Sequence, residues 1–318
     1  DTVDQKFLDE IVHLLGLENK LKNMNLFSVK DRVIVITGAT GVLGRAMVSH
    51  FAEEGAKVVM LGRNVQRGTQ IAEKARAAGG EAVFLATDVL DRTRLEGCYD
   101  AIMNMYGRID VLINAAGGNM PGATIAPDKT FFDLDTDAVR QVVDLNLFGT
   151  VLPTMVFAQA MVRQKAGSII NIASEAGLRP LTRVAGYGVA KAAVINFTRY
   201  MCGELAAKFG PGLRVNAVAP GFFLTEQNRT LLTDKDGNLT KRAETIIAHT
   251  PFGRFGEPAV GPTAVACQRR ITVRLRHGDC GGRRFRRFLH IIIIKTEDRT
   301  LLSGTPYTWH ALAGQYKA

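Results

Sequence analysis

The pattern of hydrophobic and polar positions takes three successive forms along this chain of 318 residues. Residues 1–22 place apolar side chains at helical spacing between acids and lysines, which predicts an amphipathic helix. From about residue 30 to residue 219, short apolar runs alternate with longer helical patterns. After residue 258 the alternation stops, and no clear period replaces it.

The alternating region predicts one α/β domain. Strands are expected over residues 33–37, 57–61, 82–87, 111–114, 168–174 and 214–219. Helices are expected over residues 43–54, 65–78, 91–106, 136–162 and 186–208. The strict alternation of strands and helices indicates a Rossmann-like, doubly wound parallel sheet covered on both faces. The strand runs are apolar throughout, as strands buried on both sides require.

Composition is consistent with a folded protein of the cytoplasm. Hydrophobic residues make up 47% and charged residues 22%, so a packed core is expected. The four cysteines form no CxxC pair, which excludes a disulfide framework or a zinc ribbon and is typical of a reducing compartment. We also expect no secretory signal, and no apolar stretch long enough to span a bilayer.

The net charge of +10 is concentrated at one end of the chain. Residues 259–318 hold 11 of the 40 basic and 3 of the 30 acidic residues, so they carry +8 and the rest of the chain +2. A nucleic-acid partner is therefore not expected for the main body. An arginine-rich arm that binds nucleic acid remains the competing interpretation of the tail, although few aromatic residues lie among its arginines.

A glycine-rich turn follows the first expected strand. The run Thr37-Gly38-Ala39-Thr40-Gly41-Val42-Leu43-Gly44 opens the next helix. Its glycines allow a tight turn and let backbone N–H groups approach a pyrophosphate at a helix N-terminus. An ordinary strand-to-helix turn is the alternative, but the position in the first βαβ unit favours dinucleotide binding.

Two further positions bear on the dinucleotide. Arg63 follows the second strand, where a carboxylate would bind an adenosine ribose, and an arginine there favours the 2′-phosphate of NADP(H) over NAD(H). Asp88, followed by Val89, closes the third strand and could bind the adenine amine. A solvated Arg63 and an Asp88 that caps the following helix are the alternatives.

Tyr187 and Lys191 are the candidate catalytic pair. Their i, i+4 spacing puts them on one face of a helix, where the ammonium would lower the phenol pKa and make a general acid/base. Ser174 ends a strand at the carboxyl edge of the sheet, where active sites of such folds lie. Asn146 is a polar residue within an apolar helix, and a buried, satisfied asparagine is its alternative reading.

These motifs, with Asn114-Ala115-Ala116-Gly117 and Pro220-Gly221, resemble the short-chain dehydrogenase/reductase family in order and spacing over about residues 26–258. One departure is Gly41 followed by Val42, because the commoner pattern has this glycine one place later. The turn at the phosphate is therefore expected to differ.

The resemblance implies NAD(P)-dependent oxidoreduction, with Tyr187 as acid/base, Lys191 as its support and ribose ligand, Ser174 on the carbonyl and Asn146 on a relay water. It also implies a homo-oligomer, a tetramer or dimer, if the C-terminus is intact. The implied cofactor-binding residues are Thr37, Gly38, Thr40, Gly41, Val42, Leu43, Gly44, Arg63, Asp88, Val89, Asn114, Ala115, Ala116, Gly117, Tyr187, Lys191, Pro220 and Gly221.

Residues 117–124, 179–183 and 222–229 resemble the D-mannonate oxidoreductase, or fructuronate reductase, branch. A sugar acid needs a cation for its carboxylate, and Arg179 and Arg183 are the candidates unless both are solvated. Asn119 and Gln227 are candidates for polar contacts with the substrate. Another gluconate-type sugar acid, a 3-oxoacyl thioester, or a non-catalytic dinucleotide- or nucleic-acid-binding protein are the alternatives.

The two ends differ from the resembling region. Residues 1–23 are expected to be either upstream sequence translated in frame or a helical extension. Residues 24–258 are expected to form the catalytic domain, and residues 259–318 are an arginine-rich tail. When the codons for residues 263–288 are read one base later, the genetic code permits the sequence LLWLASDASRFVxGTVIAVDGGFDAF, in which x is undetermined. This sequence resembles the helix and last strand of the family. We therefore hypothesise a frameshift near residues 257–261 that loses or alters that helix and strand. The run Ile291–Ile294 is expected to be neither a helix nor a strand with one buried face.

Overall fold

The computed structural model describes residues 28–224, 229–248, 253–256 and 291–294. The strands are β1 (Val33–Thr37), β2 (Lys57–Gly62), β3 (Glu81–Ala86), β4 (Val111–Asn114), β5 (Gly167–Ile172), β6 (Leu213–Pro220) and β7 (Ile291–Ile294). The α-helices are α3 (Val42–Glu53), α4 (Val65–Ala77), α5 (Arg92–Tyr106), α6 (Thr136–Val143), α7 (Gly149–Gln164), α8 (Ala185–Phe209), α9 (Arg229–Leu232) and α10 (Lys241–Ala248). Short helical turns are η1 (Pro121–Ala123), η2 (Phe131–Asp133), η3 (Asp144–Phe148) and η4 (Glu175–Gly177).

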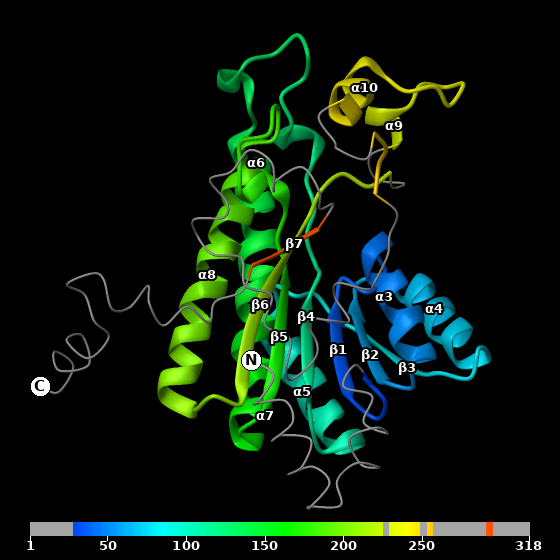
Figure 1. Ribbon diagram of the computed structural model, residues 1–318, viewed down its shortest axis with the longest axis vertical. Coiled ribbons are helices and arrows are strands. Elements are labelled where there is room, and N and C mark those ends of the chain that lie inside the picture. Colours follow the sequence, from blue (N-terminus) through cyan, green and yellow to red (C-terminus); the bar gives the residue numbers. More distant parts are fainter. Residues whose placement is uncertain (1–27, 225–228, 249–252, 257–290, 295–318) are drawn as a thin grey trace, which may run out of the picture.

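The strands form one sheet in the order β3-β2-β1-β4-β5-β6-β7 (Figure 1). The first six strands run parallel, and the order reverses direction between β1 and β4. Ligands of doubly wound sheets bind at the carboxyl ends of the strands beside such a switch point. The predicted α/β class, the six parallel strands and their approximate bounds are confirmed.

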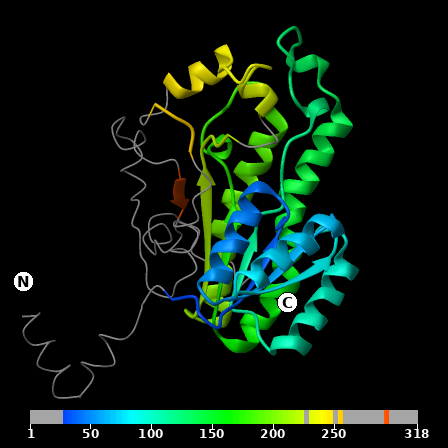
Figure 2. The same cartoon turned by 90° about the vertical axis from the view of Figure 1, so that its right-hand side faces the viewer.

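Helices cover both faces of the sheet (Figures 1 and 2). Consecutive residues of a strand point to opposite faces. Ile36 of β1 accordingly joins the core cluster of Phe51 on α3, whereas its neighbour Val35 joins the cluster of Phe157 on α7. Helix α4 shares the first cluster, and α5 and α8 share the second. All five residues of β1 are buried, as the continuous apolar run predicts.

The single helix expected over residues 136–162 is interrupted. Between α6 and α7 the chain makes a π-helical turn, η3, and Asn146 lies inside it. The Asn146 side-chain amide donates to the backbone oxygen of Val142, 2.7 Å away, and so competes with the regular helical ladder. A π-turn of this kind is frequently found at a functional site.

The combined segment Thr136–Gln164 is long and apolar enough to cross a membrane by length and composition, contrary to the expectation that no such stretch exists. In the structure 56% of its most apolar window is buried. Phe157 and Met161 pack into the core beneath the sheet. The apolar character therefore follows from its place in the core.

Strand β7 corrects the expectation for residues 291–294. These four isoleucines pair antiparallel with β6, with Ile294 opposite Ala217 and Ile291 opposite Pro220. A run of β-branched residues fits a strand, and an unpaired sheet edge offers hydrogen-bonding groups to it. The last strand of the sheet is therefore present but antiparallel. The expected helix over residues 1–22 lies outside the described residues.

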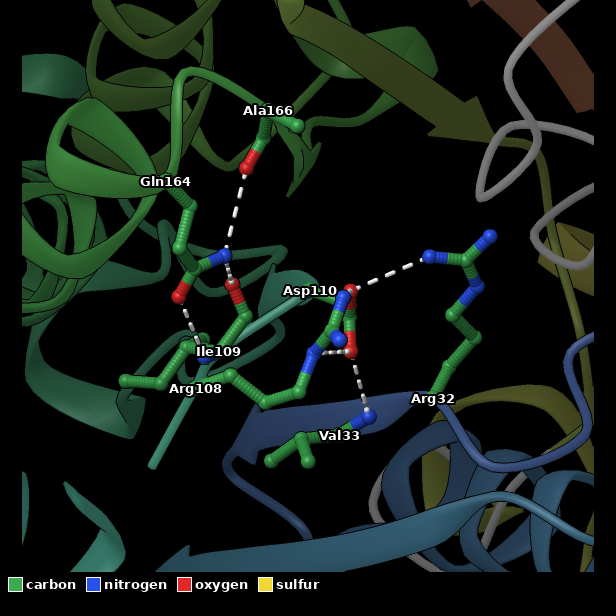
Figure 3. A network of polar contacts seen from close by, with 7 residues as sticks. All are labelled: Arg32, Val33, Arg108, Ile109, Asp110, Gln164 and Ala166. Atoms are coloured by element: carbon green, nitrogen blue, oxygen red, sulfur yellow. Dashed lines mark hydrogen bonds and ion pairs between the residues drawn. The ribbon is translucent and has the colours of Figure 1, made fainter. Parts of the chain in front are cut away.

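A charged cluster lies at the amino ends of β1 and β4, the ends opposite to the carboxyl ends of these strands (Figure 3). The Asp110 carboxylate accepts from Arg32 Nη1 at 3.1 Å, from the Val33 amide at 3.0 Å, and from Nε (3.0 Å) and Nη2 (2.5 Å) of Arg108. Gln164 at the end of α7 binds both the N–H and the carbonyl of Ile109 at 2.9 Å. The cluster ties β1, β4 and α7 together.

Candidate active site

A cavity of about 470 Å³ lies at the carboxyl ends of the strands beside the switch point. Nine of the predicted cofactor residues line it: Gly38, Thr40, Gly41, Arg63, Asp88, Val89, Ala115, Ala116 and Gly117. Four residues that were not predicted as cofactor contacts complete the lining: Gly62, Asn64, Thr87 and Leu145. The sequence therefore identified most of this pocket.

The glycine-rich turn leaves its backbone open to the cavity. Gly38 has a φ of +63°, and a Cβ there would lie 2.7 Å from the Ala115 carbonyl oxygen. A Cβ on Gly44 would collide with the Gly38 oxygen, so the helix can pack against the turn only with glycine. Gly41 is the N-cap of α3, and no side chain caps the helix there. The first N–H groups of α3 can therefore bind an anion.

Five other predicted cofactor residues do not contribute to the lining of the cavity. The buried Thr37 hydroxyl accepts from the N–H groups of Ala115 and Ala116, both at 3.1 Å, and so shapes the wall. Val42 and Leu43 begin α3, and Leu43 packs against the core. Pro220 ends β6, and Gly221 follows it. None of these side chains lines the cavity.

Arg63 and Asp88 face each other across the cavity wall. Arg63 is 72% exposed, and its Nη1 lies 3.8 Å from Asp88 Oδ2. The other Asp88 oxygen accepts from the Leu90 amide at 3.0 Å, whereas the N-cap of α5 is Asp91. Asp88 therefore braces the turn before the helix and remains able to contact a ligand.

Ser174, Tyr187 and Lys191 come together as predicted. Ser174 follows β5, and its hydroxyl hydrogen-bonds the phenol of Tyr187 in the first turn of α8. Lys191 Nζ lies 5.7 Å from the centre of the Tyr187 ring and donates to the Ile172 carbonyl at 2.7 Å. A Cβ on Gly117 would lie 3.2 Å from Nζ, so Lys191 reaches the wall of the cavity.

The electrostatics differ from the sequence expectation. Burial raises the pKa of the Tyr187 phenol, and the hydrogen bond with Ser174 opposes that shift only partly. The expected lowering by Lys191 is not found, because the ammonium is directed at the Ile172 carbonyl. Burial lowers the pKa of Lys191 to about 8. Tyr187 is thus a protonated donor at neutral pH in this structure.

Asn146 is buried and satisfied. Its amide nitrogen donates to Gly118 and Val142 carbonyls at 2.7 Å, and its oxygen accepts from the Gly118 amide at 3.1 Å. These contacts position the loop beside Gly117. The alternative reading of Asn146 is therefore correct for its side chain, and a role on a relay water stays a prediction.

The sequence missed a buried polar chain behind the site. It connects η3 and α7 to β4, β5 and α8, and all its side chains are buried. Its hydrogen bonds are Thr150 to the Asn146 carbonyl at 3.0 Å, Thr154 to the Thr150 carbonyl at 2.8 Å, Asn114 to Thr154 at 2.9 Å, Asn114 to Asn171 at 2.8 Å and Asn171 to Thr198 at 2.9 Å. The i, i+4 spacing of Asn146, Thr150 and Thr154 could have revealed it. Asn114 is thus a core residue that does not line the cavity.

The candidate substrate residues have different surroundings. Arg179 Nε pairs with Glu175 at 2.7 Å, which already neutralises its charge. Arg183 donates from Nε to the Ile125 carbonyl at 2.5 Å. Asn119 donates to Thr124 at 2.7 Å, and its own oxygen is buried without a partner among the described residues. Gln227 lies outside the described residues.

The geometry defines a class of protein: a doubly wound dinucleotide-binding fold with a Ser–Tyr–Lys site at the carboxyl edge of its sheet. The family model for the short chain dehydrogenase matches residues 32–236. This chain belongs to that family and is an NAD(P)-dependent oxidoreductase.

Several relatives place the chain within the family. An uncharacterized oxidoreductase of Bacillus subtilis (strain 168), UxuB, is 41% identical over 239 residues, which are 73% of this chain and 85% of that protein. A 3-oxoacyl-[acyl-carrier-protein] reductase of Synechocystis is 33% identical over 71% of this chain and 84% of its own length.

Solved structures are similar as well. A Haemophilus influenza protein with bound NAD, provisionally assigned as a D-mannonate oxidoreductase, has a TM-score of 0.70 and 36% identity and covers 76% of this chain and 90% of its own. A Beutenbergia cavernae protein with bound NADP, provisionally assigned as a gluconate 5-dehydrogenase, has a TM-score of 0.67 and 30% identity, with 77% and 92% covered.

Proposed function

We propose that this chain interconverts the ketone of D-fructuronate and the secondary alcohol of D-mannonate with NAD(P)(H). The hydrogen bond of Ser174 to Tyr187, with buried Lys191 beside it at the edge of the dinucleotide cavity, carries the proposal of carbonyl chemistry. The similarity to a structure provisionally assigned as a D-mannonate oxidoreductase supports the substrate.

Each side chain has a role in this reaction. A reduced nicotinamide, when bound, supplies a hydride to the carbonyl carbon. The Ser174 hydroxyl donates a hydrogen bond to the carbonyl oxygen, and the Tyr187 phenol gives that oxygen a proton as it becomes an alcohol. In the reverse direction the phenolate accepts the proton. The raised pKa of Tyr187 is consistent with a proton donor.

Lys191 has two roles in the proposal. Its ammonium, close to the Tyr187 ring, stabilises the phenolate that forms when the proton leaves. Because Nζ also reaches the wall near Gly117, it can bind the nicotinamide ribose. Asn146 holds the Gly118 backbone in place and would bind a relay water through its backbone.

NADP(H) is the proposed cofactor. The open turn at Gly38 and Gly41 and the uncapped end of α3 fit a pyrophosphate. The one carboxylate among the residues that line the described cavity is Asp88, which lies 3.8 Å from the Arg63 guanidinium. Arg63 is exposed and can pair with a 2′-phosphate. An Arg63→Ser enzyme should bind NADPH about tenfold more weakly, and its affinity for NADH should be unchanged. Equal losses of affinity for NADPH and NADH would contradict the choice of NADP(H).

A substrate panel tests the function. The enzyme should reduce D-fructuronate, and oxidise D-mannonate, with a kcat/KM at least about tenfold above those for 5-ketogluconate and a 3-oxoacyl thioester. The similarity to gluconate 5-dehydrogenase and 3-oxoacyl-[acyl-carrier-protein] reductase makes these two the alternatives. Preference for either would replace the proposed substrate. Cofactor binding without turnover on any of them would favour a non-catalytic protein.

A homo-oligomer in the cytoplasm is proposed as the functional form. Helices α7 and α8 expose Met155, Val189 and Tyr200, and the preceding turn exposes Phe148. Exposed apolar side chains gathered on two helices favour association. In the part of the chain that the structure describes, Cys98 and Cys202 form no disulfide. Sedimentation of the full chain at several concentrations tests the assembly.

We also propose that residues 24–258 form the catalytic domain and that the arginine-rich tail after it results from a frameshift. The family match over residues 32–236 supports the first part. Sequencing the gene across residues 255–288 tests the second. An added or missing base would support it; an intact frame would refute it and make the antiparallel β7 a native feature of the sheet.

A further inference from the structure

Arg183 has an unusual backbone. Its φ is +74°, in the left-handed region that non-glycine residues rarely adopt. Two hydrogen bonds hold it there: the Ile125 amide donates to the Arg183 carbonyl at 2.9 Å, and Arg183 Nε donates to the Ile125 carbonyl at 2.5 Å. Strain that is retained by its surroundings often marks a functional position. The Arg183 side chain is therefore held beside Ile125, which follows η1.

This position is close to the chemistry. Val184 is the N-cap of α8, and Tyr187 lies in the first turn of that helix. Tyr187 packs against the apolar cluster that contains Ala123, and Ala123 lies two residues before Ile125. A group bound by the Arg183 guanidinium therefore lies next to the catalytic helix turn. Val184 provides no side-chain cap, so the first N–H groups of α8 also favour an anion.

A second arginine reaches the same place from another segment. Arg242, on α10, donates from Nη1 to the Thr182 hydroxyl at 3.3 Å and from Nη2 to the Thr182 carbonyl at 3.4 Å. Helices α9 and α10 lie together beyond the carboxyl end of β6 (Figures 1 and 2). Arg242 thus connects this outer segment to the residue that precedes Arg183.

Two like charges face each other here. Burial and then the charge of Arg183 lower the pKa of the Arg242 guanidinium. In the part of the chain that the structure describes, no Asp or Glu pairs with either arginine. Arg179, four residues earlier, has Glu175 instead. Two half-buried cations without a counter-ion favour the binding of an anion between them.

We propose that Arg183 and Arg242 together bind the carboxylate of the substrate, with Arg242 as a specificity-determining residue that the sequence did not indicate. This inference rests on the proposed function, because it assigns the sugar-acid carboxylate to a place. Arg183 is held by Ile125, and Arg242 is held by Thr182, so both side chains are positioned near the first turn of α8. The pair therefore selects substrates that carry an anion over neutral ketoses.

A pair of substrates isolates the carboxylate. D-Fructuronate and D-fructose differ in having a carboxylate or a hydroxymethyl group at one end. The full-length Arg242→Gln enzyme should lose about 10- to 100-fold in kcat/KM for D-fructuronate, mostly through KM. Its kcat/KM for D-fructose should change less than about twofold. Arg183→Asn, which tolerates the left-handed backbone, should behave in the same way.

The matched control is Lys241→Gln, which removes an equal charge from the adjacent, exposed position of α10. This variant should have the wild-type kcat/KM for both D-fructuronate and D-fructose. Equal losses of Arg242→Gln and Lys241→Gln, or equal losses of Arg242→Gln on both substrates, would overturn the carboxylate site. A wild-type enzyme that turns over neither sugar acid, but reduces another ketone, would instead refute the proposed substrate.

Discussion

At the amino ends of β1 and β4, the Asp110 carboxylate accepts hydrogen bonds from two arginines and a backbone amide (Figure 3). At the carboxyl ends of the same strands, Asn114 keeps a buried oxygen without a partner among the described residues. The Gly38 and Gly117 backbone nearby borders an open cavity. One edge of the sheet satisfies its polar groups, and the other leaves room for a ligand.

The pKa shifts follow the same division. Burial alone would raise the pKa of Asp110, but hydrogen bonds from Arg108, Val33 and Arg32 hold it below its usual range. At the other edge, burial raises the pKa of Tyr187 and lowers that of Lys191 to about 8. The amino edge thus stabilises a charge, whereas burial at the Tyr187–Lys191 pair disfavours the charged form of both groups, as suits groups that exchange protons.

The largest expected effect is on activity at the carboxyl edge. Tyr187→Phe should lower kcat by about 10²- to 10⁴-fold, because it removes the proton donor. The free energy of unfolding and the affinity for the cofactor should stay close to wild type. Tyr99→Phe, the same change on α5 at a phenol without a hydrogen-bond partner among the described residues, is the control and should keep full activity. A Tyr187→Phe enzyme with more than a tenth of wild-type kcat would contradict the assigned role.

The next effect is on stability at the amino edge. Asp110→Asn should lower the free energy of unfolding by about 3 kcal/mol, because it leaves two arginines without their shared anion. The kcat of the folded enzyme should be unchanged. Denaturant unfolding and an assay on the same sample measure both. Asp100→Asn, an exposed change on α5, should have no effect on either.

Acid should act through the same carboxylate. Because the folded pKa of Asp110 is lowered, its contribution to stability is complete above the ordinary pKa, about 4. It is lost as pH falls through the lower folded value. The difference in unfolding free energy between wild type and Asp110→Asn should therefore shrink below about pH 4. A difference that stays constant down to pH 2 would contradict the cluster.

A smaller effect is expected on both activity and stability from one buried hydroxyl. Thr154→Val removes the hydroxyl between Asn114 and the Thr150 carbonyl and leaves buried polar groups without partners. We expect a loss of about 1–3 kcal/mol in unfolding free energy and a several-fold loss of kcat, because the chain ends at the Asn146 carbonyl. Thr154→Ser keeps the hydroxyl and should restore kcat. Equal kcat for the two variants would show that this series of buried hydrogen bonds does not affect catalysis.

The smallest effect concerns alkaline pH. Lys191 has a folded pKa of about 8 against an ordinary value of 10.5. Between these values the unfolded chain keeps a proton that the cofactor-free folded protein has lost, so unfolding free energy should rise with pH, by at least about 1 kcal/mol. Lys191→Met should abolish this rise. A wild-type stability that falls from pH 8 to 10 in parallel with the variant would show that Lys191 is not desolvated.

The sequence predicted the parallel sheet because its strands are buried on both faces and read as continuous apolar runs. It failed where side chains compete with the backbone. The Asn146 amide diverts the helix into a π-turn, which periodicity alone does not reveal. It also failed at β7, because four isoleucines have no alternation and their pairing with β6 is a long-range contact.

The site was predictable where chemistry and local geometry coincide. Gly38 needs a positive φ, and Tyr187 and Lys191 share a helix face, so both signals lie within a few residues. The direction of the Tyr187 pKa shift was not predictable, because it depends on burial and on where Lys191 donates. Arg242, which we propose as a substrate residue, was missed because it contacts Thr182, 60 residues earlier and beside Arg183, only in the folded chain.

The most direct test follows the hydride. The full chain is incubated with D-fructuronate and a reduced nicotinamide deuterated at its transferable position, and the product is read by NMR. The account predicts D-mannonate with deuterium at the new alcohol carbon, formed by wild type and not detectably by Tyr187→Phe over the same time. Unlabelled product, equal labelling by Tyr187→Phe, or no mannonate from a folded, cofactor-binding wild type would contradict it.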